Sequence, residues 1–330
     1  MRVDRDGFEA ALQEQRERSR SGAKQDLTRQ AELTALYDSI KRRVGDTAFL
    51  GYETTTAPGR IRAIVRDDTE YDDLEARSDT EGQVEAAAQA SIVLDETPFY
   101  PEGGGQIGDQ GVFLGEDGEV VFTVTDTQRP VSGLIVHSGT LHGKVSRRQQ
   151  VQAVVDADRR ARTMRNHTGT HVLHRALRNT LGDSARQAGS LVTPDYLRFD
   201  YPSDRGLSPE EKTAIEAEVR RVIREDRPVT PEHMSMSQAQ AAGADAFFDE
   251  KYGETVRTVR VEDYSHELCG GTHCRATGQI GGFIITGERS IGSGMRRIEA
   301  VTGEAAEALT EERFALLEAA IEAAGAQTRD

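Results

Sequence analysis

Two pairs of residues constrain the fold most, because they are typical metal ligands and lie far apart in the sequence. His167 and His171 are four residues apart in a segment with a helical pattern, so both rings lie on one face of a helix. Cys269 and His273 have the same spacing within CGGTH, where the glycines indicate a tight loop. A set of imidazole and thiolate ligands matches zinc best. The sequence therefore predicts one zinc ion bound by these four residues.

Other interpretations of these residues have to be weighed. A zinc protease is disfavoured, because its motif needs Glu directly after the first histidine, where this chain has Thr168. A purely structural zinc site stays open, since four protein ligands can saturate the ion. Cys269 and Cys274 are the only cysteines, and their neighbours favour metal chemistry over a disulfide, with ordinary core packing as the alternative. His174 is expected to pack within the helix rather than bind metal.

Composition limits the class of protein. The 330 residues suffice for two or three domains, and 36% hydrophobic with 29% charged residues indicates a soluble globular protein. The sequence has neither an apolar run of transmembrane length nor the apolar core of a signal peptide, so we expect a cytoplasmic protein without membrane contact. A net charge of −15 argues mildly against nucleic-acid binding, although basic residues cluster locally, either as an RNA-binding face or as solvated charge.

The pattern along the chain predicts an α+β protein. Residues 1–45 form a helical linker, with apolar positions at helical spacing over 4–43. Residues 46–150 contain short β-type runs broken by glycine and proline, which predicts a small antiparallel β-barrel; an acidic loop interrupts it at 67–85. Residues 151–303 mix helices and strands, with a helix from Asp158 to Leu181 and another that begins at a Ser208–Glu211 capping box. Residues 304–330 form a C-terminal helix.

Several segments, in the right order along almost the whole chain, resemble one family. NHTGTHVLHRALR, RQAGSLV, ELCGGTHCRATGQIGGF and ERSIGSGMRRIEAVTG resemble the editing domain of alanyl-tRNA synthetases and the related free-standing alanyl-tRNA editing proteins. FYPEGGGQIGDQG resembles the glycine-rich motif of the small barrel that precedes this domain, and VDRDGFEAALQEQRERSR resembles the linker that enters it. The resemblance implies an editing domain of the threonyl/alanyl type, with the aminoacylation domain missing and only the first helix of the oligomerisation region present.

The editing domain of threonyl-tRNA synthetases is similar in fold, but typically has Arg and Pro between the Cys and His of its second ligand pair. This chain has Gly270, Gly271 and Thr272 there, which favours tRNA-Ala over tRNA-Thr.

The resemblance also implies a reaction and a set of site residues. The reaction is zinc-dependent hydrolysis of the ester that joins serine or glycine to tRNA-Ala, whereas a non-catalytic zinc or tRNA-binding module is the main alternative. Gln187 resembles the family's pocket residue that positions substrate or water, and Ser190 and Thr168 help to line the pocket. A homodimer or the missing synthetase domains are further expected partners.

Contacts with tRNA are expected from two groups of residues. Arginines near the first ligand pair and in a late strand are expected to meet acceptor-stem phosphates: Arg159, Arg160, Arg162, Arg165, Arg296 and Arg297. Gly104 and Gln106, in the glycine run, either let the backbone approach the tRNA end or form a tight turn between strands.

Overall fold

The structure is a computed structural model that describes residues 28–76, 88–245, 255–292 and 294–324. They form two compact units, which are considered separately: the first comprises 1–50, 56–98 and 111–154, and the second comprises 51–55, 99–110 and 155–330. The sequence predictions for residues 1–27, for residues 77–85 of the acidic loop and for the last six residues lie outside the described residues. The described part of that loop, residues 67–76, contains two short strands that the sequence did not predict, because they pair with distant segments of the barrel.

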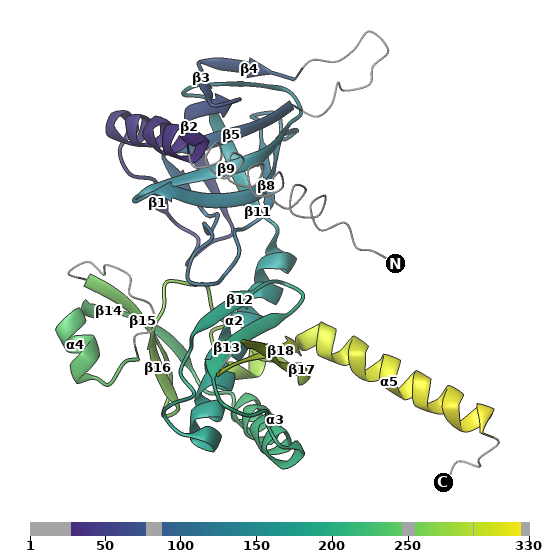
Figure 1. The fold of residues 1–330 in the computed structure, drawn as a ribbon. Coiled ribbons are helices and arrows are strands. Elements are labelled where there is room, and N and C mark those ends of the chain that lie inside the picture. The colour runs from purple at the N-terminus through teal and green to yellow at the C-terminus, as the bar shows by residue number, and fades with distance from the viewer. Residues whose placement is uncertain (1–27, 77–87, 246–254, 293, 325–330) are drawn as a thin grey trace, which may run out of the picture. The chain divides into compact units, whose positions relative to one another are not determined.

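The first unit is a β-barrel with one helix packed on it (Figure 1). Its strand order is β11-β7-β8-β9-β5-β2, and β2 pairs with β11 to close the barrel. The predicted small antiparallel barrel is thus confirmed. The barrel strands are β2 (Thr56–Arg66), β5 (Ala88–Leu94), β7 (Gly111–Leu114), β8 (Val120–Val131), β9 (Leu134–Leu141) and β11 (Gln150–Val155). Short strands lie beside them: β1 (Ala48–Phe49), β3 (Thr69–Tyr71), β4 (Asp73–Glu75), β6 (Glu96–Thr97) and β10 (Lys144–Ser146).

The described part of the predicted linker is a helix over residues 28–44. Its apolar face packs on the barrel, where Tyr37 and Ile40 join a buried cluster with Val65 and Val93. This helix therefore belongs to the barrel's core rather than to a free connector.

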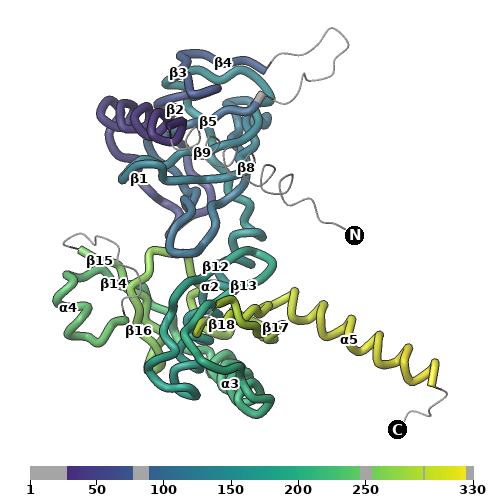
Figure 2. The backbone as a smooth tube through the Cα atoms, viewed as in Figure 1, coloured from purple at the N-terminus to yellow at the C-terminus, as the bar shows by residue number. Residues whose placement is uncertain are grey.

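The second unit contains two antiparallel sheets and the long helix α2 (Ala157–Leu181). One sheet has the order β12-β13-β18-β17, and the other β14-β15-β16. Figure 2 follows the backbone through both sheets. Their strands are β12 (Gly189–Val192), β13 (Leu197–Pro202), β17 (Phe283–Gly292), β18 (Met295–Thr302), β14 (Val229–Ser235), β15 (Thr255–Val261) and β16 (Ser265–Leu268). The remaining helices are α3 (Pro209–Arg224), α4 (Met236–Ala241), the 3₁₀ helix η1 (Thr277–Ile280) and α5 (Gly303–Ala323).

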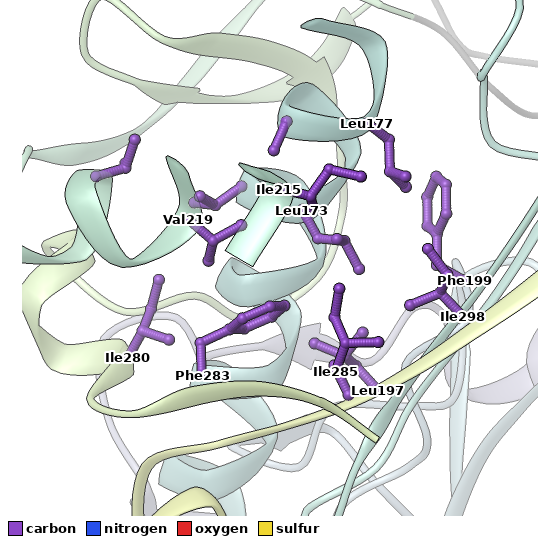
Figure 3. Packing of buried hydrophobic residues seen from close by; sticks show 14 of the residues in the cluster. Leu173, Leu177, Leu197, Phe199, Ile215, Val219, Ile280, Phe283, Ile285 and Ile298 are labelled. Carbon is purple, nitrogen blue, oxygen red and sulfur yellow. The ribbon is translucent and has the colours of Figure 1, made fainter. Parts of the chain in front are cut away.

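Helices α2 and α3 bury their apolar faces against the four-stranded sheet. Leu173 and Leu177 of α2 and Ile215 of α3 share one buried cluster with Phe199 and Ile298 of the sheet (Figure 3). This core holds the middle of α2 in place, and the middle of α2 carries the first predicted ligand pair.

The helix ends follow the sequence signals. Asp156 caps α2 by accepting a hydrogen bond from the backbone N–H of Arg159 at 2.9 Å, and α2 ends before Gly182. Ser208 and Glu211 form the predicted capping box of α3. Among the helices of the described residues, none is long and apolar enough to cross a membrane.

The glycine-rich segment differs from its predicted place. The sequence assigns it to the barrel, but Phe99–Gln110 forms part of the second unit. The reason is local pairing with β12: the N–H of Val192 donates to the carbonyl of Gly105 at 2.7 Å, and the N–H of Ile107 donates to the carbonyl of Val192 at 3.2 Å. The segment thereby acts as an extra edge to the sheet of the second unit.

Candidate metal site

The four predicted ligands come together in the second unit. Their side-chain donor atoms all lie within 4.8 Å of one another. His167 and His171 lie on one face of α2, Cys269 follows directly after β16, and His273 lies in the loop before η1. Because the ligand atoms converge from two distant segments, the fold supplies the geometry of a single metal-binding cluster.

A buried glutamine orients His167. Its Nδ1 lies 2.7 Å from Oε1 of Gln106, which is fully buried and also accepts the backbone N–H of Thr272 at 2.9 Å. An amide oxygen only accepts, so the imidazole hydrogen is on Nδ1 and Nε2 keeps its lone pair. Nε2 faces Sγ of Cys269 at 3.5 Å. The side chain of Gln106 is therefore buried beside the ligand cluster, and the expected approach of this segment's backbone to the tRNA end stays a prediction.

A buried carboxylate, that of Glu267, lies next to Nδ1 of His171. Oε2 of Glu267 lies 3.0 Å from Nδ1 of His171, as an ion-pair contact rather than a well-aligned hydrogen bond. Oε1 of Glu267 lies 2.9 Å from Nδ1 of His174, which is buried one turn further along α2. The predicted packing residue His174 thus also holds the carboxylate that faces a metal ligand.

The hydroxyl of Thr168 contacts the third imidazole, that of His273. Oγ1 of Thr168 accepts the backbone N–H of Cys274 at 3.0 Å and lies 3.2 Å from Nδ1 of His273. Nε2 of His273 lies 3.2 Å from Sγ of Cys269, so it faces the cluster. His167 and His273 therefore present Nε2 to Cys269 and have Nδ1 close to an oxygen atom, which is the usual arrangement of metal-binding histidines.

The electrostatics suit a metal ligand set. Burial disfavours the Cys269 thiolate, but His167 and His273 outweigh it and hold the pKa of Cys269 well below its usual range. Burial and the neighbouring His167 lower the pKa of His273, which keeps that ring neutral. At His171 burial opposes the charged form, yet Glu267 and Cys269 raise the pKa to about 9. A thiolate beside imidazoles and a compensating carboxylate fits a divalent cation, which would replace the imidazolium proton.

The CGGTH loop fits closely against His167. A Cβ atom on Gly271 would lie 2.0 Å from Cε1 of His167, so no larger residue fits at that position. Nη1 of Arg257 donates to the carbonyls of Cys269 at 2.7 Å and Gly271 at 3.0 Å, and Tyr52 donates to the carbonyl of Gly270 at 2.6 Å. The loop that carries Cys269 is thus fixed by two side chains that sequence reasoning missed.

Gln187 and Ser190 contact each other, and Ser190 lies against the glycine-rich segment. Nε2 of Gln187 donates to Oγ of Ser190 at 3.4 Å. A Cβ atom on Gly105, which has φ +85°, would lie 2.3 Å from that Oγ. Within the described residues no hydrogen bond joins Gln187 or Ser190 to the four ligands, so their assignment to the pocket stays a prediction.

The arginines expected to bind tRNA have protein partners. Arg160 is buried and pairs with Asp109, with Nε 2.9 Å from each carboxylate oxygen, so it cannot reach a phosphate. Arg296 and Arg297 each form a two-pronged pair, with Glu288 and Asp200.

The three remaining arginines of that group also have partners in the protein. Arg159 donates to the carbonyl of Gly108, Arg162 pairs with Asp195, and Arg165 pairs with Glu304. Contacts of these three with RNA stay predictions, as does an approach to Gly104, which is exposed.

A pocket of about 740 Å³ adjoins the metal cluster, and all its lining residues belong to the second unit. His273 and Thr272 form part of its wall, together with Tyr52, Arg257 and Arg275. The cavity is of the size that small-molecule sites have, about 300–1,000 Å³.

Comparisons with known proteins agree with this geometry. Residues 1–159 match the model of class II (A) tRNA synthetases, and residues 256–299 match the second additional domain of threonyl and alanyl tRNA synthetases. The chain is 43% identical over 305 residues to the alanine–tRNA ligase of Pelotomaculum thermopropionicum, which covers 92% of this chain and 33% of that protein. The chain belongs to the alanyl-tRNA synthetase family. The alanine–tRNA ligase of Fervidobacterium nodosum is 45% identical over 302 residues, covering 91% of this chain and 33% of that enzyme.

The matched regions locate the site within this family. The second matched segment contains Cys269 and His273, so two of the four clustered residues lie in the editing-type domain of this family member. The chain spans about a third of the length of the curated relatives it matches.

Proposed function

We propose that this member of the alanyl-tRNA synthetase family hydrolyses Ser-tRNA-Ala or Gly-tRNA-Ala in a zinc-dependent reaction. The observation that carries the proposal is the convergence of His167, His171, Cys269 and His273 within 4.8 Å beside a pocket. When bound, zinc would supply Lewis-acid chemistry at an ester carbonyl or a water molecule. A mischarged tRNA-Ala is accordingly the proposed partner.

The residues around the cluster have distinct proposed tasks. Gln106, Glu267 and Thr168 hold the three imidazoles in the orientation that a metal needs. Thr168 therefore acts as a positioning residue rather than as part of the pocket lining that the sequence predicted. Gln187 and Ser190 supply polar groups that would engage a serine hydroxyl or position water.

A hydrolytic pocket solves a problem of discrimination. A synthetic site shaped for alanine rejects an added hydroxyl only weakly and cannot exclude the smaller glycine by bulk. A second site that hydrogen-bonds the hydroxyl distinguishes serine far better, because alanine would leave the buried polar groups of that site unpaired.

A second candidate is a structural metal site in a module that only binds tRNA. The four-residue ligand set favours it, because a closed tetrahedral site leaves no position for a reacting oxygen. The two candidates differ in one measurable respect, since only the first releases an amino acid from tRNA.

The test is release of labelled serine from Ser-tRNA-Ala by the full chain. We expect rapid release that spares Ala-tRNA-Ala and Ser-tRNA-Thr and is lost with Cys269→Ala. A His167→Ala variant that lacks metal but retains full activity would exclude a role of the metal in hydrolysis. A folded, zinc-loaded protein that releases no serine would favour the structural metal site, and equal release from Ser-tRNA-Thr would indicate threonyl-type editing.

A further inference from the structure

An ion pair is buried where the glycine-rich segment meets the start of α2. Arg160 is 3% exposed and Asp109 is 2% exposed. Nε of Arg160 lies 2.9 Å from each carboxylate oxygen of Asp109, and its Nη2 also contacts Oδ2. Burying two charges costs free energy that their mutual attraction often only just returns, so such a pair is weak evidence of a purely stabilising role. Its contacts with the rest of the second unit indicate a different role.

Asp109 fixes both ends of the loop that carries Gln106. Its Oδ2 accepts the backbone N–H of Tyr100 at 2.6 Å, and its own N–H donates to the carbonyl of Tyr100 at 2.9 Å. The hydroxyl of Tyr100 donates to the carbonyl of Gly103 at 3.0 Å, and Gly103 exchanges two backbone hydrogen bonds of 3.0 Å with Gln106. The backbone of Gln106 is thereby tied to Asp109, while its side chain holds Nδ1 of His167.

Arg160 makes a second connection, to the segment that carries Gly51 and Tyr52. Its Nη1 donates to the carbonyl of Gly51 at 2.7 Å. The next residue, Tyr52, donates from its hydroxyl to the carbonyl of Gly270 at 2.6 Å. The same guanidinium group therefore holds both the loop of the glycine-rich segment and the segment that supports the CGGTH loop.

The place of Arg160 on α2 directs these two connections at the metal site. Arg160 precedes His167 by seven residues, which is close to two turns, so both side chains lie on the same face of the helix. Gln106 contacts His167 of the first ligand pair, and Tyr52 contacts the loop of the second pair. One buried ion pair is thus linked by hydrogen bonds to the supports of both ligand pairs.

We propose that Arg160 and Asp109 are positioning residues of the metal site, which act through Gln106 and Tyr52 and raise the affinity of the ligand set for zinc. This inference rests on the proposed function, because zinc is the metal that this function requires. Ligands that are held in place in advance bind more tightly, since less conformational freedom is lost on binding.

The test compares the zinc affinities of folded variants by competition with a chromophoric chelator, so it needs no tRNA substrate. Asp109→Asn keeps an oxygen for the N–H of Tyr100 but loses the charge that pairs with Arg160. It should weaken zinc binding about tenfold, the lower end of the usual range for outer partners of metal-bound histidines. Arg160→Lys should weaken it severalfold, because an ammonium group cannot hold Asp109 and Gly51 together as a planar guanidinium does.

A double-mutant cycle separates positioning from a general effect on the fold. Asp109→Asn should weaken zinc binding about tenfold in the parent chain but less than about twofold in a Gln106→Met chain, which has already lost the contact with His167. A pair that only stabilises the fold would change both affinities by the same factor. Circular dichroism shows which variants are folded. Should Asp109→Asn not fold, the same cycle is run with Arg160→Lys, whose effect should likewise shrink in the Gln106→Met chain.

A matched control uses an exposed two-pronged pair of the same unit. Nη1 and Nη2 of Arg289 each lie 3.0 Å from an oxygen of Glu299, and the two side chains are 56% and 29% exposed. Arg289→Lys and Glu299→Gln make the same chemical changes at a pair outside these connections. Both should leave the zinc affinity within about twofold of the parent value.

The outcomes distinguish this inference from the hydrolytic function. Equal losses of affinity in the two backgrounds would overturn the positioning role even if the parent chain releases serine. A folded Asp109→Asn chain that binds zinc as tightly as the parent would overturn it as well. A cycle that behaves as expected in a chain that releases no serine would support the positioning role and reject the hydrolytic function.

Discussion

The Oε1 atom of Gln106 accepts hydrogen bonds from two separate parts of the metal site, the imidazole of His167 and the backbone N–H of Thr272. Its Nε2 donates to Oγ1 of Thr272 at 2.9 Å. One side chain from the glycine-rich segment therefore connects the helical ligand pair with the CGGTH loop. This explains why that segment belongs with the second unit.

Gln106→Met is expected to weaken metal binding by about 10- to 100-fold, the usual effect of losing the partner of a metal-bound histidine. The methionine fills the same space but offers His167 no acceptor oxygen. Gln106→Glu, which keeps an acceptor, should lose much less. Competition with a chromophoric zinc chelator measures both affinities, and a Met variant that binds as tightly as the parent protein would show that the hydrogen bond does not orient the ligand.

The ligand pairs could be predicted from the sequence because their spacing alone places two rings on one helix face. Their supporting residues could not, because hydrogen-bond partners come from distant segments. The rule that metal-bound histidines donate to carboxylates would have marked Glu267, two residues before Cys269. The pairing of Arg160 could not be predicted for the same reason: clustered charge is visible in a sequence, but the Asp109 that neutralises Arg160 is not.

At the scale of elements, β9 carries a buried histidine, His137, that should make the stability of the barrel depend on pH. Nδ1 of His137 donates to the carbonyl of Ile92 at 3.0 Å, and Thr97 lies 2.8 Å from Nε2. Burial is the main cause that lowers the pKa of His137 to about 4, against 6.5 for a free histidine. The folded barrel therefore holds this ring neutral where an unfolded chain would bind a proton.

The free energy of unfolding should rise with pH between the two values. Above pH 6.5 the ring is neutral in the folded and the unfolded state, and below about pH 4 it is protonated in both. Between these values only the unfolded state binds the proton, so the free energy of unfolding falls by about 3 kcal/mol as the pH falls from 6.5 to 4. Because glutamine does not titrate, the free energy of unfolding of His137→Gln should depend less steeply on pH in this range. Urea unfolding followed by circular dichroism at pH 4.5 and 7.0 gives the two slopes, and equal slopes would mean that another group causes the acid sensitivity.

Element boundaries could be predicted where capping chemistry is local, as at Gly182 and Ser208, and the helix expected from Asp158 begins one residue earlier, after its cap Asp156. The place of the segment Phe99–Gln110 could not, because its pairing with β12 joins residues far apart in the chain. Glycine runs indicate a tight turn but not which sheet the turn contacts.

At the scale of the whole molecule, the α+β organisation with a small barrel could be predicted from the change in periodicity along the chain. The membership of interleaved segments in the two units could not, because it depends on tertiary contacts. All four proposed ligands lie in the second unit, so metal binding should stabilise that unit and not the barrel.

Removal of the metal should therefore loosen the second unit and leave the barrel protected. A ligand present at a thousand times its Kd stabilises the folded state by about 4 kcal/mol, which lowers the population of the open binding unit by about a thousandfold. Hydrogen exchange of peptides from α2 and β16 should accelerate after chelation, whereas peptides from β5 and β9 should not change. Cys269→Ala in the presence of zinc should reproduce the pattern. Faster exchange in β9 as well would show that the two units open together, and unchanged exchange in α2 would show that the metal is not held by His167 and His171.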